Sequence, residues 1–337
     1  MPAPLSVTGN HRVMSRQFSP ARCALFVLTL FAGPASACDF CLMHQGISPL
    51  ETLNGHGLRV TQHYTDVDAV YQGTDRRPDP GAEEQFWTTD ITAFYSLPQL
   101  EGLLLQFNLP VRVTRGAGDV RTAADGSVDR DTAHGGDSGI GDVSLLARYT
   151  FLRRHTLAST LYLALSAGFK APTGATDGRD NAGAFMDAHT QVGTGSYDAL
   201  VGLSGNYVRG RFGVAVSAFG SLTGAGEFGD TRHRFGDSLN YAVSGRYRLT
   251  PAVLGGSAMQ LFAAAGISGE ARRREHEEGA RVTDSGGHTL YVTPGLQLNV
   301  NAHWVAEVSY HHAIYHRLNG TQLGENYKVF GSLTYLF

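Results

Sequence analysis

The feature that most constrains this sequence is an apolar period of two, which recurs in long segments from Leu58 onward. In the clearest of them, residues 103–113, every second residue is apolar, and most of the residues between are polar. Side chains of a strand point alternately to its two faces, so each such segment has one apolar and one polar face. The pattern predicts an all-β fold.

Twelve segments follow this pattern, and most of them reach the roughly 9–11 tilted residues with which a strand crosses a bilayer. They span residues 57–66, 86–97, 101–114, 139–153, 157–171, 193–208, 211–223, 236–250, 258–270, 288–299, 302–314 and 327–337. Short turns alternate strictly with long polar stretches between them. The long stretches are 67–85, 115–138, 172–192, 224–235, 271–287 and 315–326.

An even number of strands, with short turns at one end and long loops at the other, is typical of outer-membrane barrels. We therefore expect residues 57–337 to form one transmembrane antiparallel β-barrel of about twelve strands, with both ends of the mature chain in the periplasm. A large soluble all-β protein is the alternative, but a soluble sandwich has no reason to segregate its loops by length.

Residues 1–37 contain the parts of a cleaved export signal in their usual order. Three arginines and no acidic residue precede the apolar run 24–32, and the small residues 35–37 suit a signal peptidase. The apolar run is too short to cross a membrane as a helix. We expect the mature chain to begin at Cys38 and to be located in the outer membrane.

The last segment ends on Phe337, and its apolar face carries Val329, Leu333 and Tyr335. An aromatic terminal residue on such a strand resembles the signal read by the outer-membrane insertion machinery, so we expect that machinery and membrane lipid to be partners. The formal net charge is −3 and no basic block or face appears, so nucleic acid is not an expected partner.

Residues 38–56 form a short N-terminal segment in which Cys38, Cys41 and His44 have metal-ligand spacing. Two thiolates and an imidazole would suit Cu(I) or Zn(II). A local disulfide, idle thiols, redox exchange with a partner and lipidation of Cys38 are alternatives. A capping box at 48–51 predicts a short helix, which either hangs in the periplasm or plugs the barrel.

The polar faces supply candidate residues for the barrel interior. The charged candidates are Arg59, Arg112, Arg148, Lys170, Arg246 and Arg248 with Asp90, Asp142, Asp198 and Glu307, and the aromatic candidates are Phe94, Tyr162, Phe219, Phe262 and Tyr291. They predict a polar track with aromatic rungs for a flat solute. A narrow barrel that fills its own interior with paired charges and rings is an equally good interpretation.

Histidines 311, 312 and 316 lie close enough in sequence to suggest a metal site, but neighbouring residues of a strand point to opposite faces. Polar residues at a wet rim are the simpler explanation. Barrel phospholipases need a His-x-Ser-Asn-Gly motif, and the nearest stretch here, 316–320, has Leu318 in place of the serine. The paired acidic and His–Asp rims of omptin-like proteases have no equivalent, so an enzyme is not expected.

Two stretches resemble a known family. Residues 135–149 carry a Gly-x-Gly-Asp sequence followed by apolar alternation, and residues 168–174 read Gly-Phe-Lys-Ala-Pro-Thr-Gly. Both are similar to outer-membrane transporters named after the MetA pathway of phenol degradation. The resemblance implies a channel or transporter for small molecules, including aromatic or hydrophobic ones. The alternatives are a barrel that binds or senses a soft metal through Cys38, Cys41 and His44, and a non-conducting anchor.

Overall fold

The computed structural model describes residues 55–337 apart from positions 79, 118–119, 123–127, 131–133 and 253–258. The predicted signal, the Cys38, Cys41 and His44 set and the predicted helix after Ser48 therefore lie outside the described residues. All regular elements of the described part of the chain are β-strands. No helix among the described residues is long and apolar enough to cross a membrane.

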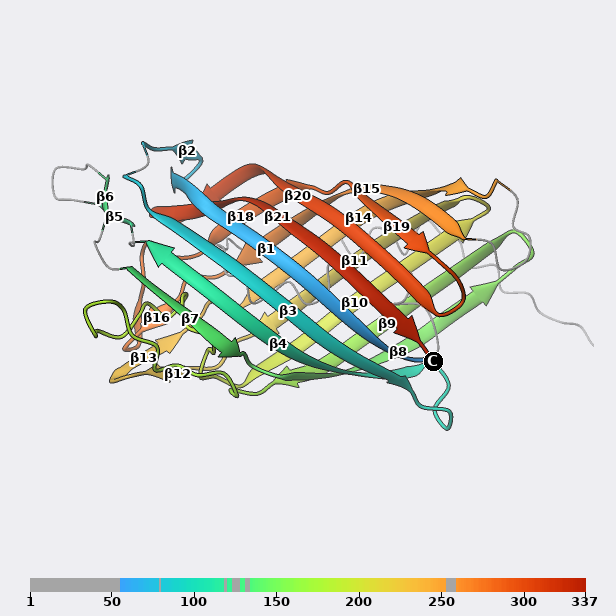
Figure 1. Ribbon diagram of the computed structural model, residues 1–337, viewed down its shortest axis with the longest axis horizontal. Coiled ribbons are helices and arrows are strands. Elements are labelled where there is room, and N and C mark those ends of the chain that lie inside the picture. The colour runs from blue at the N-terminus through green and yellow to red at the C-terminus, as the bar shows by residue number, and fades with distance from the viewer. Residues whose placement is uncertain (1–54, 79, 118–119, 123–127, 131–133, 253–258) are drawn as a thin grey trace, which may run out of the picture. The chain divides into compact units, whose positions relative to one another are not determined.

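Twelve spans form one closed antiparallel barrel (Figure 1), as the apolar period predicts. They are β1 (His56–Gln72), β3 (Glu83–Ser96), β4 (Leu103–Ala117), β7 (His134–Ile140) continued by β8 (Ser144–His155), β9 (Ser159–Lys170), β10 (Asp198–Arg209), β11 (Phe212–Leu222), β14 (Ser238–Thr250), β15 (Gln260–Arg272), β18 (Gly287–Val292) continued by β19 (Gly295–Asn299), β20 (Trp304–Leu318) and β21 (Thr321–Leu336). The first and last spans close the barrel, since β1 pairs with β21 and sets Leu58 opposite Tyr335.

The burial pattern of the wall is that of a barrel in lipid, with apolar side chains outside and polar side chains inside. In β4, Val111 and Val113 are 37% and 38% exposed, whereas Arg112 and Thr114, which alternate with them, are 4% and 1% exposed. Lipid offers no hydrogen-bond partners, so the apolar face must point outward and the polar face inward. The predicted alternation is confirmed.

The fourth span is interrupted by a bulge between β7 and β8. Val111 of β4 is paired with Ile140, and Asn108 with Ser144, so residues 141–143 oppose only two residues of β4. Such a bulge bends the strand and re-aims its side chains. The result is that Asp142, in the bulge, is buried to 1% exposure.

The connections divide into a short-turn end and a long-loop end. The short turns are residues 97–102, 156–158, 210–211, 251–259 and 300–303, and the longer connections are 73–82, 118–133, 171–197, 223–237 and 273–286. By the usual arrangement of outer-membrane barrels, we expect the short-turn end to face the periplasm. The chain enters β1 and leaves β21 at that end.

Short strands lie within the connections at the long-loop end. They are β2 (Asp75–Arg76), β5 (Val120–Thr122), β6 (Val128–Arg130), β12 (Gly226–Phe228), β13 (Thr231–Arg234), β16 (His276–Glu277) and β17 (Ala280–Arg281). The last four form one sheet, in which His233 of β13 pairs with Glu277 of β16. This sheet holds connections 223–237 and 273–286 together.

The prediction of a long loop at 315–326 is wrong. Strand β20 continues to Leu318 and β21 begins at Thr321, so only Asn319 and Gly320 lie between them. Gly320 has a φ of 65°, a left-handed conformation that glycine adopts without strain. Polar residues were expected to leave the strand, but an Asn-Gly pair is a strong hairpin signal and supports a tight turn. The strict alternation of long and short connections therefore fails at the last connection.

The lipid-facing side of the wall predicts that a charged side chain placed there lowers the free energy of unfolding, most strongly near the middle of the membrane. Val243 lies midway along β14 and is 55% exposed, so Val243→Arg places a guanidinium in the lipid. We expect a loss of about 2–4 kcal/mol in the free energy of unfolding from phospholipid vesicles, measured by urea titration. Val300→Arg, in a short turn outside the strands, is the control and should change that free energy by less than about 0.5 kcal/mol. Equal penalties would contradict the assignment of the lipid-facing surface.

Candidate functional site

The connection between β9 and β10, residues 171–197, folds against the inner wall of the barrel, and we call it the inner loop. The Arg112 guanidinium of β4 donates to the backbone carbonyls of Gln191 and Val192, at 3.3 and 3.1 Å. Both loop residues are almost fully buried, with exposures of 0% and 1%. Because Arg112 is on the polar face of its strand, the inner loop narrows the interior at the long-loop end.

A buried cluster of charges lies where the inner loop meets the wall. The Lys170 ammonium, at the end of β9, is 2.7 Å from Asp198 Oδ2 and 3.4 Å from Asp142 Oδ2. The three side chains come from β9, β10 and the bulge between β7 and β8, and none is more than 2% exposed. We call these three residues, together with Thr194 and Ser196, the charge node.

The inner loop supplies most of the remaining hydrogen bonds of the node. The backbone N–H and the hydroxyl of Thr194 donate to Asp142 Oδ2 at 2.9 and 2.6 Å. The backbone N–H of Gly174 donates to the other Asp142 oxygen at 2.9 Å. Ser196 Oγ donates to Asp198 Oδ1 at 2.8 Å. Both carboxylates therefore have partners from the loop as well as from Lys170.

Two glycines let the loop cross itself beside the node. A side chain on Gly193 would lie 2.3 Å from the Gly174 carbonyl oxygen, and one on Gly174 would lie 2.6 Å from the Gly193 Cα. Next to this crossing, the Thr173 hydroxyl donates to the Gly141 carbonyl at 3.0 Å. The two stretches that carry the family resemblance, residues 135–149 and 168–174, thus meet at this node.

The node contains one ammonium group for two carboxylates. Removing charges from water is costly, and mutual attraction offsets the cost only where hydrogen bonds satisfy the remaining lone pairs. Here backbone N–H groups and hydroxyls provide those bonds. The node therefore holds β9, β10, the bulge and the inner loop in one arrangement.

A second buried charge cluster is carried by β15, β18 and β21. Lys328 Nζ is 2.6 Å from Glu325 and 3.2 Å from Glu270, and the Arg272 guanidinium is 3.2 Å from Glu270. The Tyr291 hydroxyl donates to Glu325. This cluster is balanced in charge. Lys170 and Lys328 are the two lysines of the sequence, so each cluster contains one of them.

The predicted interior residues are distributed around the wall rather than gathered in one site. Three arginines have separate partners: Arg59 lies 3.8 Å from Glu307, Arg246 donates to Asn206 at 3.5 Å, and Arg248 donates to the Pro251 carbonyl at 3.2 Å. Tyr162 is hydrogen-bonded to His155 at 3.0 Å, and Asn108 donates to Asp90 at 2.9 Å. Arg148 is buried at 4% exposure, Phe94 and Phe262 are half-buried, and the Arg246 guanidinium lies 5.8 Å from the Phe262 ring centroid. Their role in permeation stays a prediction. Lys170, Asp142 and Asp198 are the members of the predicted set that come together as a buried group of three charges.

The three histidines near the end of β20 do not converge. His311 is buried and lies 3.2 Å from the Ser309 hydroxyl, whereas His312 is exposed on the opposite face. His316 is stacked on Tyr71 with ring centroids 4.2 Å apart. Alternation along the strand separates neighbouring side chains, as expected.

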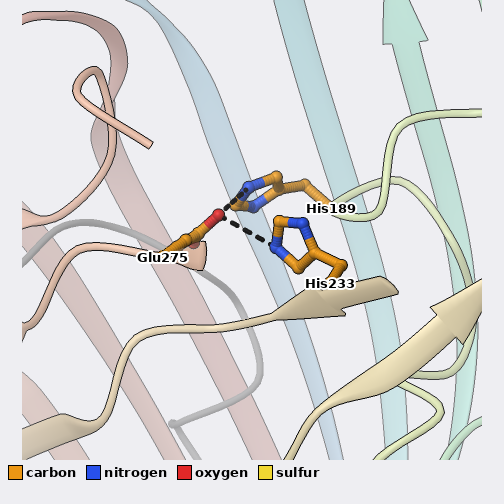
Figure 2. A group of neighbouring side chains, drawn as sticks. All are labelled: His189, His233 and Glu275. Carbon is orange, nitrogen blue, oxygen red and sulfur yellow. Dashed lines mark hydrogen bonds and ion pairs between the residues drawn. The ribbon is translucent and has the colours of Figure 1, made fainter. Parts of the chain in front are cut away.

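Histidine and glutamate side chains do meet elsewhere, at a cluster that the sequence did not reveal. His189 Nε2 is 3.0 Å and His233 Nε2 is 3.2 Å from Glu275 Oε2 (Figure 2). Burial would raise the pKa of the Glu275 carboxyl, but the two imidazoles lower this pKa to well below its ordinary value. The three residues belong to different loops, so no local spacing could indicate the cluster.

Comparison with known proteins agrees with this architecture. A family model described as "Putative MetA-pathway of phenol degradation" matches residues 87–312, more than half of the chain. An outer membrane channel from Pseudomonas putida F1 has a TM-score of 0.65 and 17% identity, covering 85% of this chain and 96% of that chain. The similarity shows a common barrel fold, and the chain is an outer-membrane protein.

Two further barrels are less similar. The beta domain of the Bordetella autotransporter BrkA has a TM-score of 0.40 and 12% identity, covering 84% of this chain and 100% of that chain. The Pseudomonas putida toluene transporter TodX has a TM-score of 0.36 and 10% identity, covering 90% and 95%. No curated protein matches the sequence.

The charge node predicts a large effect of removing its cation. Lys170→Met leaves two buried carboxylates without their ammonium partner. We expect the free energy of unfolding to fall by about 3–5 kcal/mol, measured by urea titration of the refolded barrel. Arg273→Ala is the control, because that side chain is 73% exposed and its loss should cost less than about 1 kcal/mol. Similar losses in both variants would show that the node does not hold the fold.

Proposed function

The chain belongs to the family described as "Putative MetA-pathway of phenol degradation", and we propose that it is an outer-membrane channel for small aromatic or apolar molecules. The observation that carries this proposal is a closed barrel with polar side chains on its inner face and one inner loop that is anchored to that face by Arg112. A loop in that position can select solutes before they reach the wall below it. The family description favours a phenol-like aromatic solute.

An apolar patch on the inner wall supports the choice of solute. Leu146 of β8, Leu200 of β10 and Phe219 of β11 pack together and are buried at 2%, 4% and 7% exposure. Leu200 is two residues further toward the short-turn end than Asp198, so the patch follows the charge node along the same strand. At these exposures the three side chains are covered, so a flat aromatic ring would gain dispersion contacts with them only after the residues above them move.

The order of these two features suggests how a solute would be handled. The charge node and Arg112 fix the inner loop near the long-loop end, so the loop sets the width that a solute meets first. The apolar patch lies further toward the short-turn end. A solute must be able to leave as well as enter, so conduction requires weak binding along this path.

Planar-bilayer recording tests this proposal against the rival, a non-conducting barrel that anchors the Cys38, Cys41 and His44 segment. Refolded protein should give discrete openings, and cells that lack the protein should take up phenol more slowly than wild type. Heat-modifiable migration on gels confirms that the refolded sample is a barrel. No openings and no change in phenol uptake would reject the channel and favour the anchor.

The inner loop predicts a variant with larger current. Arg112→Ala removes both hydrogen bonds to residues 191 and 192 and so weakens the hold of the loop on β4, where the bond from Thr114 to the Thr190 carbonyl remains. We expect a higher single-channel conductance, or longer openings, than in the wild-type barrel. Arg154→Ala, an exposed arginine near the short-turn end of β8, is the matched control and should leave the conductance unchanged. Unchanged current in Arg112→Ala would show that the loop does not limit passage.

A further inference from the structure

Three connections at the long-loop end, which are distant in sequence, bring possible metal-ligand atoms to one point. His189 lies in the inner loop, His233 in β13, and Glu275 between β15 and β16 (Figure 2). Both imidazoles direct Nε2 at the same carboxylate oxygen, at 3.0 and 3.2 Å. The three ligand atoms lie within 4.8 Å of one another. Among the described residues, this is the group of histidine and acidic side chains with metal-ligand geometry.

The spacing suits a small divalent metal ion. Zn²⁺ binds imidazole nitrogen and carboxylate oxygen at about 2.0–2.2 Å, so neighbouring ligand atoms of a tetrahedral site lie about 3.3 Å apart. The two nitrogen–oxygen distances here differ from that spacing by only a few tenths of an ångström. Two histidines and one glutamate leave a fourth position open for water.

The glutamate has a buried oxygen that lacks a partner. Glu275 is 2% exposed, and its Oε1 has no hydrogen-bond partner among the described residues. Leaving a carboxylate oxygen unsatisfied in a buried site is costly, and a bound cation would remove that cost. The backbone N–H of Glu275 donates to Ser285 Oγ at 2.9 Å, which fixes the position of the carboxylate-bearing residue.

Aromatic rings enclose the histidines. The Phe235 ring is 4.8 Å from the His233 ring and 5.4 Å from the His189 ring, and Phe228 is 5.9 Å from His233. An apolar shell lowers the local dielectric constant and strengthens the attraction between a cation and its ligands. The His189 side chain is 27% exposed, which leaves the cluster an approach from outside.

We propose that His189, His233 and Glu275 bind one Zn²⁺ ion, which ties the inner loop to the two connections that carry β13 and β16. The ion would replace the direct contacts between imidazole and carboxylate with three metal–ligand bonds. It would hold His189 only one residue from Thr190, where the inner loop begins its contacts with β4. Its effect on solute passage rests on the proposed channel, but its binding does not.

The test is calorimetric titration of Zn²⁺ into the refolded mature chain carrying Cys38→Ser and Cys41→Ser. These two substitutions remove the thiols that would compete for the ion in the N-terminal segment. The barrel is titrated alone in detergent, without solute or current, so the result does not depend on channel activity. We expect one equivalent of Zn²⁺ to bind.

Three single variants in that background locate the ion. His189→Ala, His233→Ala and Glu275→Gln should each weaken binding by more than the roughly 10–100-fold that loss of an outer-shell partner costs. Glu275→Gln keeps the size of the side chain and guards against a folding defect. His276→Ala is the matched control, since His276 adjoins Glu275 but is not a member of the cluster. Each variant is first checked for heat-modifiable migration.

The outcomes divide clearly. Weak binding in the three cluster variants, with unchanged binding in His276→Ala, supports the site. Absence of Zn²⁺ binding in the parent barrel overturns it and leaves the cluster as a direct contact between one carboxylate and two imidazoles. Binding that is equal in the parent and in folded Glu275→Gln and His233→Ala also overturns it.

Discussion

Closure of the sheet between β1 and β21 is the constraint on which the rest of this structure depends. A strand in lipid cannot leave backbone N–H and C=O groups unpaired, because no water is present to satisfy them, and only closure removes both edges. Once the first and last strands pair, each span has a lipid face and an interior face. Every second side chain must then be apolar, while the residues between them are free to carry charge. The inward position of Arg112 between Val111 and Val113 follows directly.

The charged side chains of the interior form local clusters instead of a uniform polar lining. Lys170 and Lys328, the two lysines of the chain, are both nearly fully buried, and each is surrounded by carboxylates. A buried ammonium is stable only with such partners. The bulge that buries Asp142 next to Lys170 shows how a small irregularity in a regular wall creates the charge node.

The sequence predicts the wall well and the loop structure poorly. Residues 103–113 reveal a span because alternation is a local signal that lipid enforces. That signal weakens toward the ends of β20 and β21, where buried positions carry polar residues such as His316, Thr321 and Glu325. Polar residues between Tyr315 and Asn326 consequently resembled a loop, although the strands continue almost to the Asn319–Gly320 turn. The hydropathy pattern therefore marks the part of a strand that lies in the lipid, but not the full length of the strand.

Sites formed between loops leave no such local trace. Lys170, Asp142 and Asp198 were each predicted to face inward, yet their meeting depends on the bulge and on the path of the inner loop. The cluster of His189, His233 and Glu275 was missed because its members are more than 40 residues apart along the chain. Only the pairing of β13 with β16 brings two of them together.

The inner loop is held at several separate places, and their distribution matters more than the strength of any one. Glu275 contacts it at His189, Arg112 contacts it at Gln191 and Val192, and the charge node contacts it at Thr194 and at Gly174. These attachments lead to different strands of the barrel wall and to the connection between β15 and β16. Loss of one attachment therefore leaves the inner loop held by the others. This arrangement permits the mobility of the loop to increase in steps at the long-loop end, while the barrel wall stays unchanged.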